Sequence, residues 1–257
     1  MNALRKFVND HPLTVFVVAA YALSWWSIPF ANGGILPHGP FFAALIVLAL
    51  TKGRVGLTEL LRRIVSWWGG WHWLIIGPGL VIAYLLLALG INLLLGATIT
   101  NTAHFGTFAQ SLLILVLLGG VWEEPGWTGY ALPILQARYA SQPFSQLKAS
   151  LLMGVIRAGW HLPLVFSGAI PWYDAVFFSM AFQFLITWLF NRTQGSVLIV
   201  MLFHLTSNIV GGGIMVPLFS GADQTRYYLL FIATAWLLAL SLAWQNMWSI
   251  GQRDPKQ

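Results

Sequence analysis

The chain has 257 residues, of which 58% are hydrophobic and 8% are charged. Because an ordinary soluble domain carries about 25% charged residues, this composition excludes a water-soluble globular protein. The formal net charge is +6, yet the Lys and Arg residues are spread between apolar segments and form no single basic face, which argues against nucleic-acid binding. Cysteine is absent, which excludes disulfides and cysteine-based metal sites.

Apolar segments near the ~20 residues that a helix needs to cross a bilayer recur along the chain. They predict an all-α, polytopic membrane helix bundle of about eight transmembrane helices, in which residues 1–257 form a single integral-membrane domain. The second segment is the shortest and least certain span. The predicted spans are 13–31, 39–51, 71–95, 109–135, 149–167, 172–190, 196–212 and 227–248.

The distribution of Lys and Arg predicts the orientation, because positively charged loops remain cytoplasmic. If the N-terminus with Arg5 and Lys6 is cytoplasmic, eight crossings place almost all connecting-loop cations on the same side, and only Arg226 borders the outside. Both termini are therefore expected in the cytoplasm. The cations on that side would also include Lys52, Arg54, Arg62, Arg63, Arg138, Lys148, Arg192, Arg253 and Lys256.

Two adjacent carboxylates, Glu123 and Glu124, lie in the otherwise uncharged fourth span. An ionisable side chain inside a membrane costs roughly 2.5–3.5 kcal/mol on insertion scales and marks a functional site by default. Successive helical residues point about 100° apart, so the two carboxylates should face different surroundings. Pro125 and Gly126 follow directly and are expected to distort the helix just after the pair.

Two other spans each carry a polar stripe. Arg157 and His161 in the fifth span, and His204 and Asn208 in the seventh, are i,i+4 pairs that share one helix face. Pro163 should interrupt the fifth span beyond His161. The two histidines and Glu123 lie at similar depths, so we expect them to meet.

These segments resemble the three motifs of the CPBP intramembrane proteases, which include the type II CAAX prenyl endopeptidase and bacteriocin-processing or immunity proteins. The matching residues lie in order within a core of about 109–212. They are Glu123-Glu124-Pro125-Gly126-Trp127-Thr128-Gly129-Tyr130-Ala131-Leu132-Pro133, Trp160-His161-Leu162-Pro163 and His204-Leu205-Thr206-Ser207-Asn208.

The resemblance implies an endopeptidase that hydrolyses a peptide bond with a glutamate-activated water. Glu123 would be the general base and Glu124 would orient the site, while His161, His204 and Asn208 would bind the water or the developing oxyanion. The implied partners are membrane lipid and a membrane-bound or lipidated polypeptide substrate. The implied location is a prokaryotic plasma membrane, as a multi-pass protein.

One position departs from the family pattern. An arginine usually follows the two glutamates after three residues, and this chain has Thr128 there. We hypothesise that Arg157 supplies the missing cation, which requires its guanidinium to lie within about 6 Å of a glutamate. The alternative is that Arg157 extends along the helix to the cytoplasmic interface. The departure also leaves a catalytically impaired homologue open.

No cofactor is expected, and no metal, because the helical His-Glu-x-x-His zinc signature is absent from the sequence. Zinc at Glu123, His161 and His204 is the alternative. Two other classes also remain: a non-catalytic scaffold or bacteriocin immunity protein of the same family, and a transporter. A transporter usually has polar interruptions in both halves of the chain, whereas here the intramembrane polarity lies in the second half.

Overall fold

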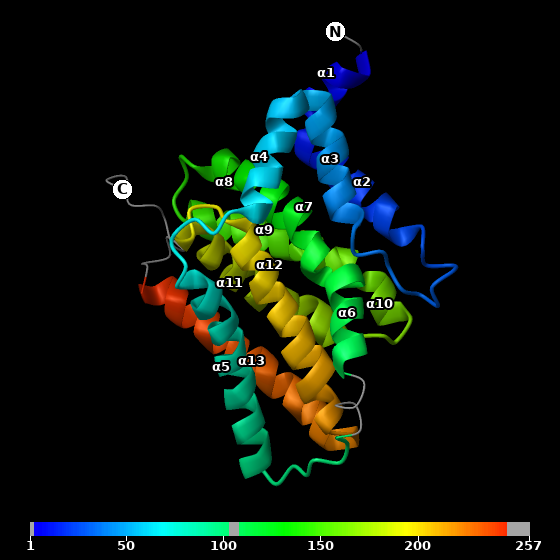
Figure 1. Cartoon of the computed structure of the whole chain (residues 1–257), viewed down its shortest axis with the longest axis vertical. Helices are drawn as coiled ribbons and strands as arrows, with labels where there is room; N and C mark the ends of the chain where they lie inside the picture. Colours follow the sequence, from blue (N-terminus) through cyan, green and yellow to red (C-terminus); the bar gives the residue numbers. More distant parts are fainter. Residues whose placement is uncertain (1–2, 103–107, 246–257) are drawn as a thin grey trace.

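The computed structural model describes residues 3–102 and 108–245, and the regular structure within these ranges is entirely helical (Figure 1). The helices are α1 (Ala3–Asp10), α2 (Pro12–Trp25), α3 (Gly39–Thr51), α4 (Gly53–Val65), α5 (Trp73–Leu94), α6 (Phe108–Leu118), α7 (Glu124–Gly126), α8 (Leu132–Tyr139), α9 (Ser145–Trp160), α10 (Leu162–Phe166), α11 (Ser179–Arg192), α12 (Val197–Thr206) and α13 (Gly221–Gln245). The predicted all-α fold is confirmed for these residues.

Each predicted span overlaps helical structure, although the helices differ in length. Among the described residues, four helical segments are long and apolar enough to cross a membrane: Trp73–Leu94, Asp174–Arg192, Val197–Leu218 and Gly221–Gln245. Shorter apolar helices cover Pro12–Trp25 and Gly39–Thr51. The chain is therefore an integral membrane protein, while eight crossings and cytoplasmic termini stay predictions. The end of the last predicted span, with Arg253 and Lys256, lies outside the described residues.

The fourth predicted span is not one continuous helix. It breaks at Gly119, whose extended backbone (φ −86°, ψ 171°) separates α6 from a 3₁₀ turn at Gly120–Glu123. The distortion predicted just after the glutamate pair is present as the π-helical turn at Trp127–Ala131, whereas the sequence did not predict this break before the pair. Pro125 lies in the first turn of the helical segment that follows, where its missing N–H costs no hydrogen bond, so it starts a helix here.

Between residues 108 and 245, wide π-helical turns occur in three places. They cover Trp127–Ala131, Asp174–Phe178 and Ser207–Met215. The third turn includes three consecutive glycines, residues 211–213. The helical segment that begins with α12 continues through it to Leu218, beyond the predicted end at residue 212. Such turns are rare and concentrate at functional sites.

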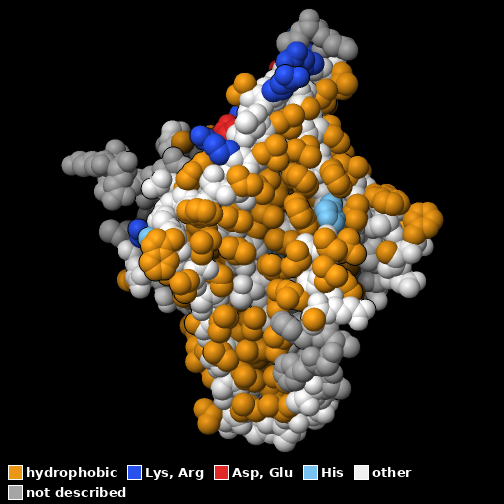
Figure 2. All heavy atoms as spheres, viewed as in Figure 1, with side chains coloured by type: hydrophobic (Ala, Val, Ile, Leu, Met, Phe, Trp, Pro, Cys, Tyr) orange, Lys and Arg blue, Asp and Glu red, His pale blue; other side chains and the backbone are white. Residues whose placement is uncertain are grey.

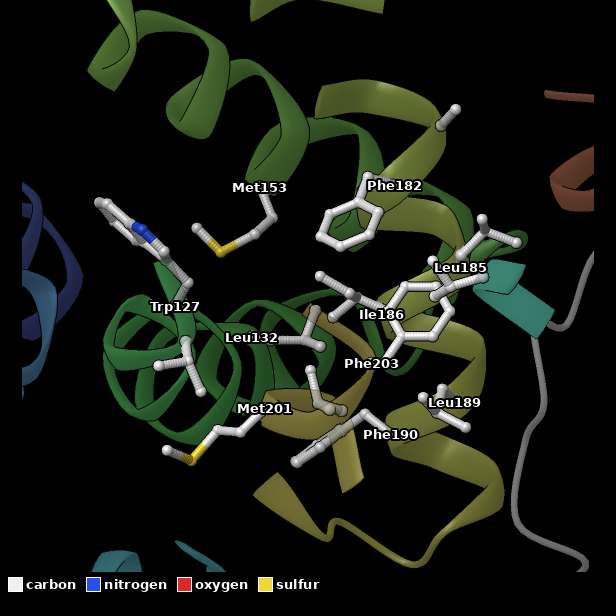
Figure 3. Close-up of a cluster of buried hydrophobic side chains, with 14 of the residues drawn as sticks. Trp127, Leu132, Met153, Phe182, Leu185, Ile186, Leu189, Phe190, Met201 and Phe203 are labelled. Carbon is white, nitrogen blue, oxygen red and sulfur yellow. The ribbon is translucent and has the colours of Figure 1, made fainter. Parts of the chain in front are cut away.

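The centre of the bundle is built around α11, which is the most buried of the four long segments. Figure 3 shows its side chains Phe182, Leu185, Ile186 and Leu189 in one buried cluster with side chains from other elements. Trp127 belongs to the π-helical turn after the glutamates, Met153 to α9 and Phe203 to α12. This apolar packing fixes the relative positions of the helices that carry the polar motifs.

The outer surface is suited to lipid. Large apolar side chains of α5, including Ile75, Leu87 and Leu94, point outward, and hydrophobic side chains cover most of the face in Figure 2. The Lys and Arg side chains visible on this face lie in the upper half of the view, toward α1. The cations seen on this face thus avoid the lower part of the view, and the predicted orientation of the termini stays a prediction.

Candidate active site

Arg157 joins the two glutamates. Its Nη2 lies 2.7 Å from Glu124 Oε1 and 3.3 Å from Glu123 Oε2, and its Nη1 lies 3.3 Å from Glu124 Oε2. Only 2% of Arg157 is exposed, so the alternative that it extends to the membrane interface is wrong. The distance condition for Arg157 to replace the family's arginine is met.

Glu124 is fully enclosed by donors. Besides the two-pronged contact with Arg157, Glu124 Oε1 lies 2.6 Å from His204 Nδ1. Thr128 Oγ1 donates to Glu124 Oε2 at 2.5 Å. Thr128 therefore occupies the family's arginine position and still binds the carboxylate. Both oxygens of Glu124 are engaged, which leaves this side chain to hold the others in place.

Glu123 has a different environment from its neighbour, as the 100° helical offset predicted. Arg157 contacts only its Oε2. A Cβ atom added to Gly120 would lie 2.6 Å from both Glu123 Oε1 and His204 Nε2. The second oxygen of Glu123 and the second nitrogen of His204 thus converge on the space beside Gly120, which is free because this residue has no side chain.

His161 directly follows the last residue of α9, and its ring is oriented by the backbone. Its Nδ1 lies 2.9 Å from the carbonyl oxygen of Arg157. A carbonyl oxygen only accepts hydrogen bonds, so His161 Nδ1 carries the proton. In the neutral ring, Nε2 is then a hydrogen-bond acceptor. The carboxylate of Glu124 fixes the proton on His204 Nδ1 in the same way.

The predicted residues meet at one cavity of about 240 Å³. Its lining includes Glu123, Arg157, His161, His204 and Asn208, which come from the three motif-bearing segments. Glu124 and Thr128 are buried behind this wall, each with 0% exposure. The structure therefore brings all seven predicted residues together, with five at the cavity and two supporting them.

Sequence reasoning missed three residues at this centre. Gln183 accepts a hydrogen bond from Arg157 Nη1 at 3.3 Å and is itself bound to Thr187. Its position as an amide in the middle of an apolar span was a usable signal. Asp174, at the start of its span, also lines the cavity. Gly120 gave no signal beyond its position near the glutamates.

The closest candidate metal ligands in the described part of the chain are Glu123, Glu124 and His204, whose ligand atoms lie within 4.8 Å of one another. This set differs from the zinc alternative, which used His161 and not Glu124. His161 Nδ1 is directed to a backbone carbonyl. Arg157 already binds oxygens of both carboxylates, so a cation would have to share them with a guanidinium.

Fold and site together define an α-helical integral membrane protein with a buried centre of two carboxylates, a guanidinium and two imidazoles. Residues 105–210 match the sequence model of the family described as type II CAAX prenyl endopeptidase Rce1-like. This range contains all three motifs. The resemblance to the CPBP proteases is therefore confirmed for residues 105–210.

A curated relative agrees with this assignment. The chain is 32% identical over 143 residues to a protein of Methanococcus maripaludis named CAAX prenyl protease 2. The matched region covers 49% of this chain and 51% of the relative, so the chain spans about half the length of the curated relative that it matches.

Proposed function

We propose that this chain is an intramembrane endopeptidase that hydrolyses a peptide bond in a prenylated or otherwise lipid-anchored polypeptide. The observation that carries the proposal is the convergence of Glu123 Oε1 and His204 Nε2 on the space beside Gly120. The opposite atoms of both groups are held, Glu123 Oε2 by Arg157 and His204 Nδ1 by Glu124. A water molecule bound in this space would have a base and an imidazole in contact with it.

Glu123 is the general base in this proposal. Its free Oε1 takes a proton from the water, whose oxygen adds to the carbonyl carbon of the scissile peptide bond. The tetrahedral intermediate then breaks the C–N bond, and Glu123 returns the proton to the leaving amine. No covalent bond to the protein forms, so a serine or cysteine nucleophile is not needed.

The remaining residues bind the water molecule and stabilise the charge that develops during the reaction. The neutral His161 Nε2 accepts a hydrogen bond from the water, while Asn208 donates to the oxyanion. His204 donates to it through Nε2 as an imidazolium, with Nδ1 still bound to Glu124. Such preorganised donors are worth roughly 3–4 kcal/mol each in a water-excluded site. The two carboxylates and the guanidinium carry a net charge of −1. One added proton, which can move during the reaction, makes the cluster neutral.

The arrangement of Arg157 and Thr128 supports an active enzyme despite the missing family arginine. Arg157 reaches the same carboxylates from α9, and Thr128 supplies a hydrogen bond to Glu124. The proposal therefore favours catalysis over the scaffold and immunity alternatives. It also assigns the chemistry to the carboxylate, without a metal ion.

Mass spectrometry of peptides released from membranes tests this function. Membranes containing the wild-type protein should release fragments that are missing from membranes with Glu123→Gln at equal protein level. Cleavage should continue in the presence of a chelator such as EDTA. Identical peptide sets from the two proteins would refute the peptidase. Loss of cleavage on chelation, restored by zinc, would refute the metal-free reaction.

A further inference from the structure

A cavity of about 400 Å³ lies between α3, α4 and α8, and it shares no lining residue with the cavity at the glutamates. These three helices lie in the upper part of Figure 1. Three predicted spans begin or end at its wall: Pro12 lies just before 13–31, Lys52 just after 39–51, and Ile134 at the end of 109–135. The cavity is therefore expected at the level of the lipid headgroups, which flank the hydrocarbon core.

The lining of this cavity has an apolar part and a basic part. The apolar part includes Leu48 of α3, Leu60 of α4 and Ile134 of α8. The basic part consists of Lys52 and Arg63. A phospholipid has the same two parts, because its acyl chains are apolar and its phosphate is negatively charged.

Within the described residues, the ammonium group of Lys52 has no acceptor in an ion pair or a side-chain hydrogen bond. A Cβ atom added to Gly56, another lining residue, would lie 2.7 Å from Lys52 Cβ and 3.4 Å from Lys52 Cδ, so the Lys52 side chain runs along the wall of the cavity. Arg63 Nη2 donates to Glu59 Oε1 at 2.7 Å. The guanidinium has five N–H donors, so this bond leaves others for a second acceptor.

Glu59 supplies the opposing charge in this wall. Its hydrogen bond from Arg63 and the charges of Arg63, Lys52 and Arg62 lower its pKa, so the carboxylate stays ionised. Lys52, Arg63 and Glu59 are the charged residues of the lining, and together they carry a net charge of +1. A net positive charge at the headgroup level attracts anionic lipids.

A neighbouring cavity of about 320 Å³ has room for a lipid headgroup. Arg63 and Pro133 line both cavities. The neighbouring one is otherwise lined mainly by amides, those of Gln136, Gln146 and Asn191. Amide groups both donate and accept hydrogen bonds, so they suit a headgroup that carries hydroxyls, such as glycerol.

We propose that the cavity between α3, α4 and α8 binds an anionic phospholipid. The phosphate binds to Lys52 and Arg63, an acyl chain lies over the apolar part of the lining, and the headgroup reaches the amides of the neighbouring cavity. This site does not depend on the proposed peptidase function, because none of its lining residues belongs to the catalytic centre.

Native mass spectrometry of the whole chain in neutral detergent tests the site. Dioleoyl-phosphatidylglycerol, which is anionic, is titrated against dioleoyl-phosphatidylcholine, which has the same chains and no net charge. We expect one phosphatidylglycerol per chain to bind about fivefold more tightly, the effect of one net positive charge near the membrane surface. Glycerophosphoglycerol, the same headgroup without acyl chains, should not displace the lipid at tenfold excess.

Three variants assign the binding to this cavity. Lys52→Gln should weaken phosphatidylglycerol binding about fivefold, whereas Glu59→Gln should strengthen it by a similar factor, because it removes the opposing charge and releases Arg63. Lys148→Gln is the matched control. It removes a cation of the same type from α9, outside both cavities, and should leave the affinity unchanged.

Each other outcome would overturn the site. Equal affinities for the two lipids would remove the role of charge. Equal losses in Lys52→Gln and Lys148→Gln would show a diffuse attraction to the basic surface. Displacement by glycerophosphoglycerol would identify a site for free phosphate compounds, and displacement by a farnesylated tetrapeptide would assign the cavity to the polypeptide substrate.

Discussion

In the described part of the chain, two clusters use an arginine and a carboxylate to connect separate helices, and they differ in what they leave unpaired. In the first, Asn92, Asp223 and Arg226 connect α5 to α13. Arg226 Nε donates to Asn92 Oδ1 at 2.7 Å and its Nη2 to Asp223 Oδ1 at 2.9 Å. Asp223 Oδ2 accepts from the backbone N–H of Thr98. Every strong acceptor has a donor, and the cluster ties regular helices together.

The second cluster, at the glutamates, is more deeply buried and less completely paired. The Arg157 side chain is 2% exposed, against 34% for that of Arg226. Yet Glu123 Oε1 and His204 Nε2 are directed to the open space beside Gly120, and the surrounding helices contain 3₁₀ and π turns. The first cluster is structural, because all of its polar groups are paired. In the second cluster, one atom of Glu123 and one of His204 are bound by protein groups, and the other atom of each faces open space.

The largest expected difference between the clusters is in activity. Glu123→Gln removes the proposed base and should lower kcat for peptide cleavage by about 10³-fold, within the range of general-base catalysis. Asp223→Asn, the matched carboxylate-to-amide change in the other cluster, should retain kcat within about twofold, since it lies outside the proposed reaction. The measurement is single-turnover cleavage in proteoliposomes. Equal losses in the two variants would show that the first cluster is only structural.

Stability should show the next difference. Arg157→Met leaves two carboxylates buried without their cation and should lower the free energy of unfolding by about 3–5 kcal/mol. Arg226→Met breaks a partly exposed ion pair, worth about 1 kcal/mol or less, and leaves the buried Asn92 Oδ1 without its donor. Its loss should therefore be about 1–3 kcal/mol, below that of Arg157→Met. Thermal unfolding in detergent, followed by circular dichroism, compares the two variants. If Arg226→Met lowered the free energy of unfolding more than Arg157→Met, the expectation that the more deeply buried cluster costs more to disrupt would be wrong.

A smaller effect is expected when the open space is filled. Gly120→Ala places a Cβ in contact with Glu123 Oε1 and His204 Nε2 and should lower kcat by about 10²-fold through misplacement of the reacting groups. Gly90→Ala in α5 is the matched control, because a Cβ there meets nothing within 4 Å. If Gly120→Ala cleaved peptide at the wild-type rate, the reaction would have to occur elsewhere.

The smallest effect concerns the departure from the family pattern. Thr128→Val keeps the shape of the side chain and removes its hydrogen bond to Glu124, which should cost about 1–3 kcal/mol of stability because a buried acceptor loses a donor. Activity should fall by less than tenfold, since Arg157 still holds Glu124. Chemical denaturation and cleavage rates check both values. A loss of activity as large as that of Glu123→Gln would assign Thr128 a direct part in the reaction.

The sequence predicted the residues of the site more accurately than it predicted the local backbone conformation. The cost of buried charge singled out Glu123, Arg157 and His204, and their similar depths together with the resemblance to the three family motifs placed them in one centre. The break at Gly119 could not be found this way, because Pro125 is the stronger helix breaker in isolation and only the tertiary packing shows that it begins a helix. Gly120 was missed for a related reason. It matters because it has no Cβ atom, and only the tertiary structure shows that this leaves space beside Glu123 and His204.

Each π-helical turn changes the direction in which side chains after the turn point, relative to side chains before it. Each adds a residue relative to regular α-helical bonding. The turn at Trp127–Ala131 follows Glu124 and precedes the buried Leu132 and Leu135 of α8. Deleting one residue there would rotate α8 by about 100° relative to the glutamates. The extra residue of this π-helical turn therefore allows the glutamate pair and the buried side chains of α8 to face their own partners at the same time.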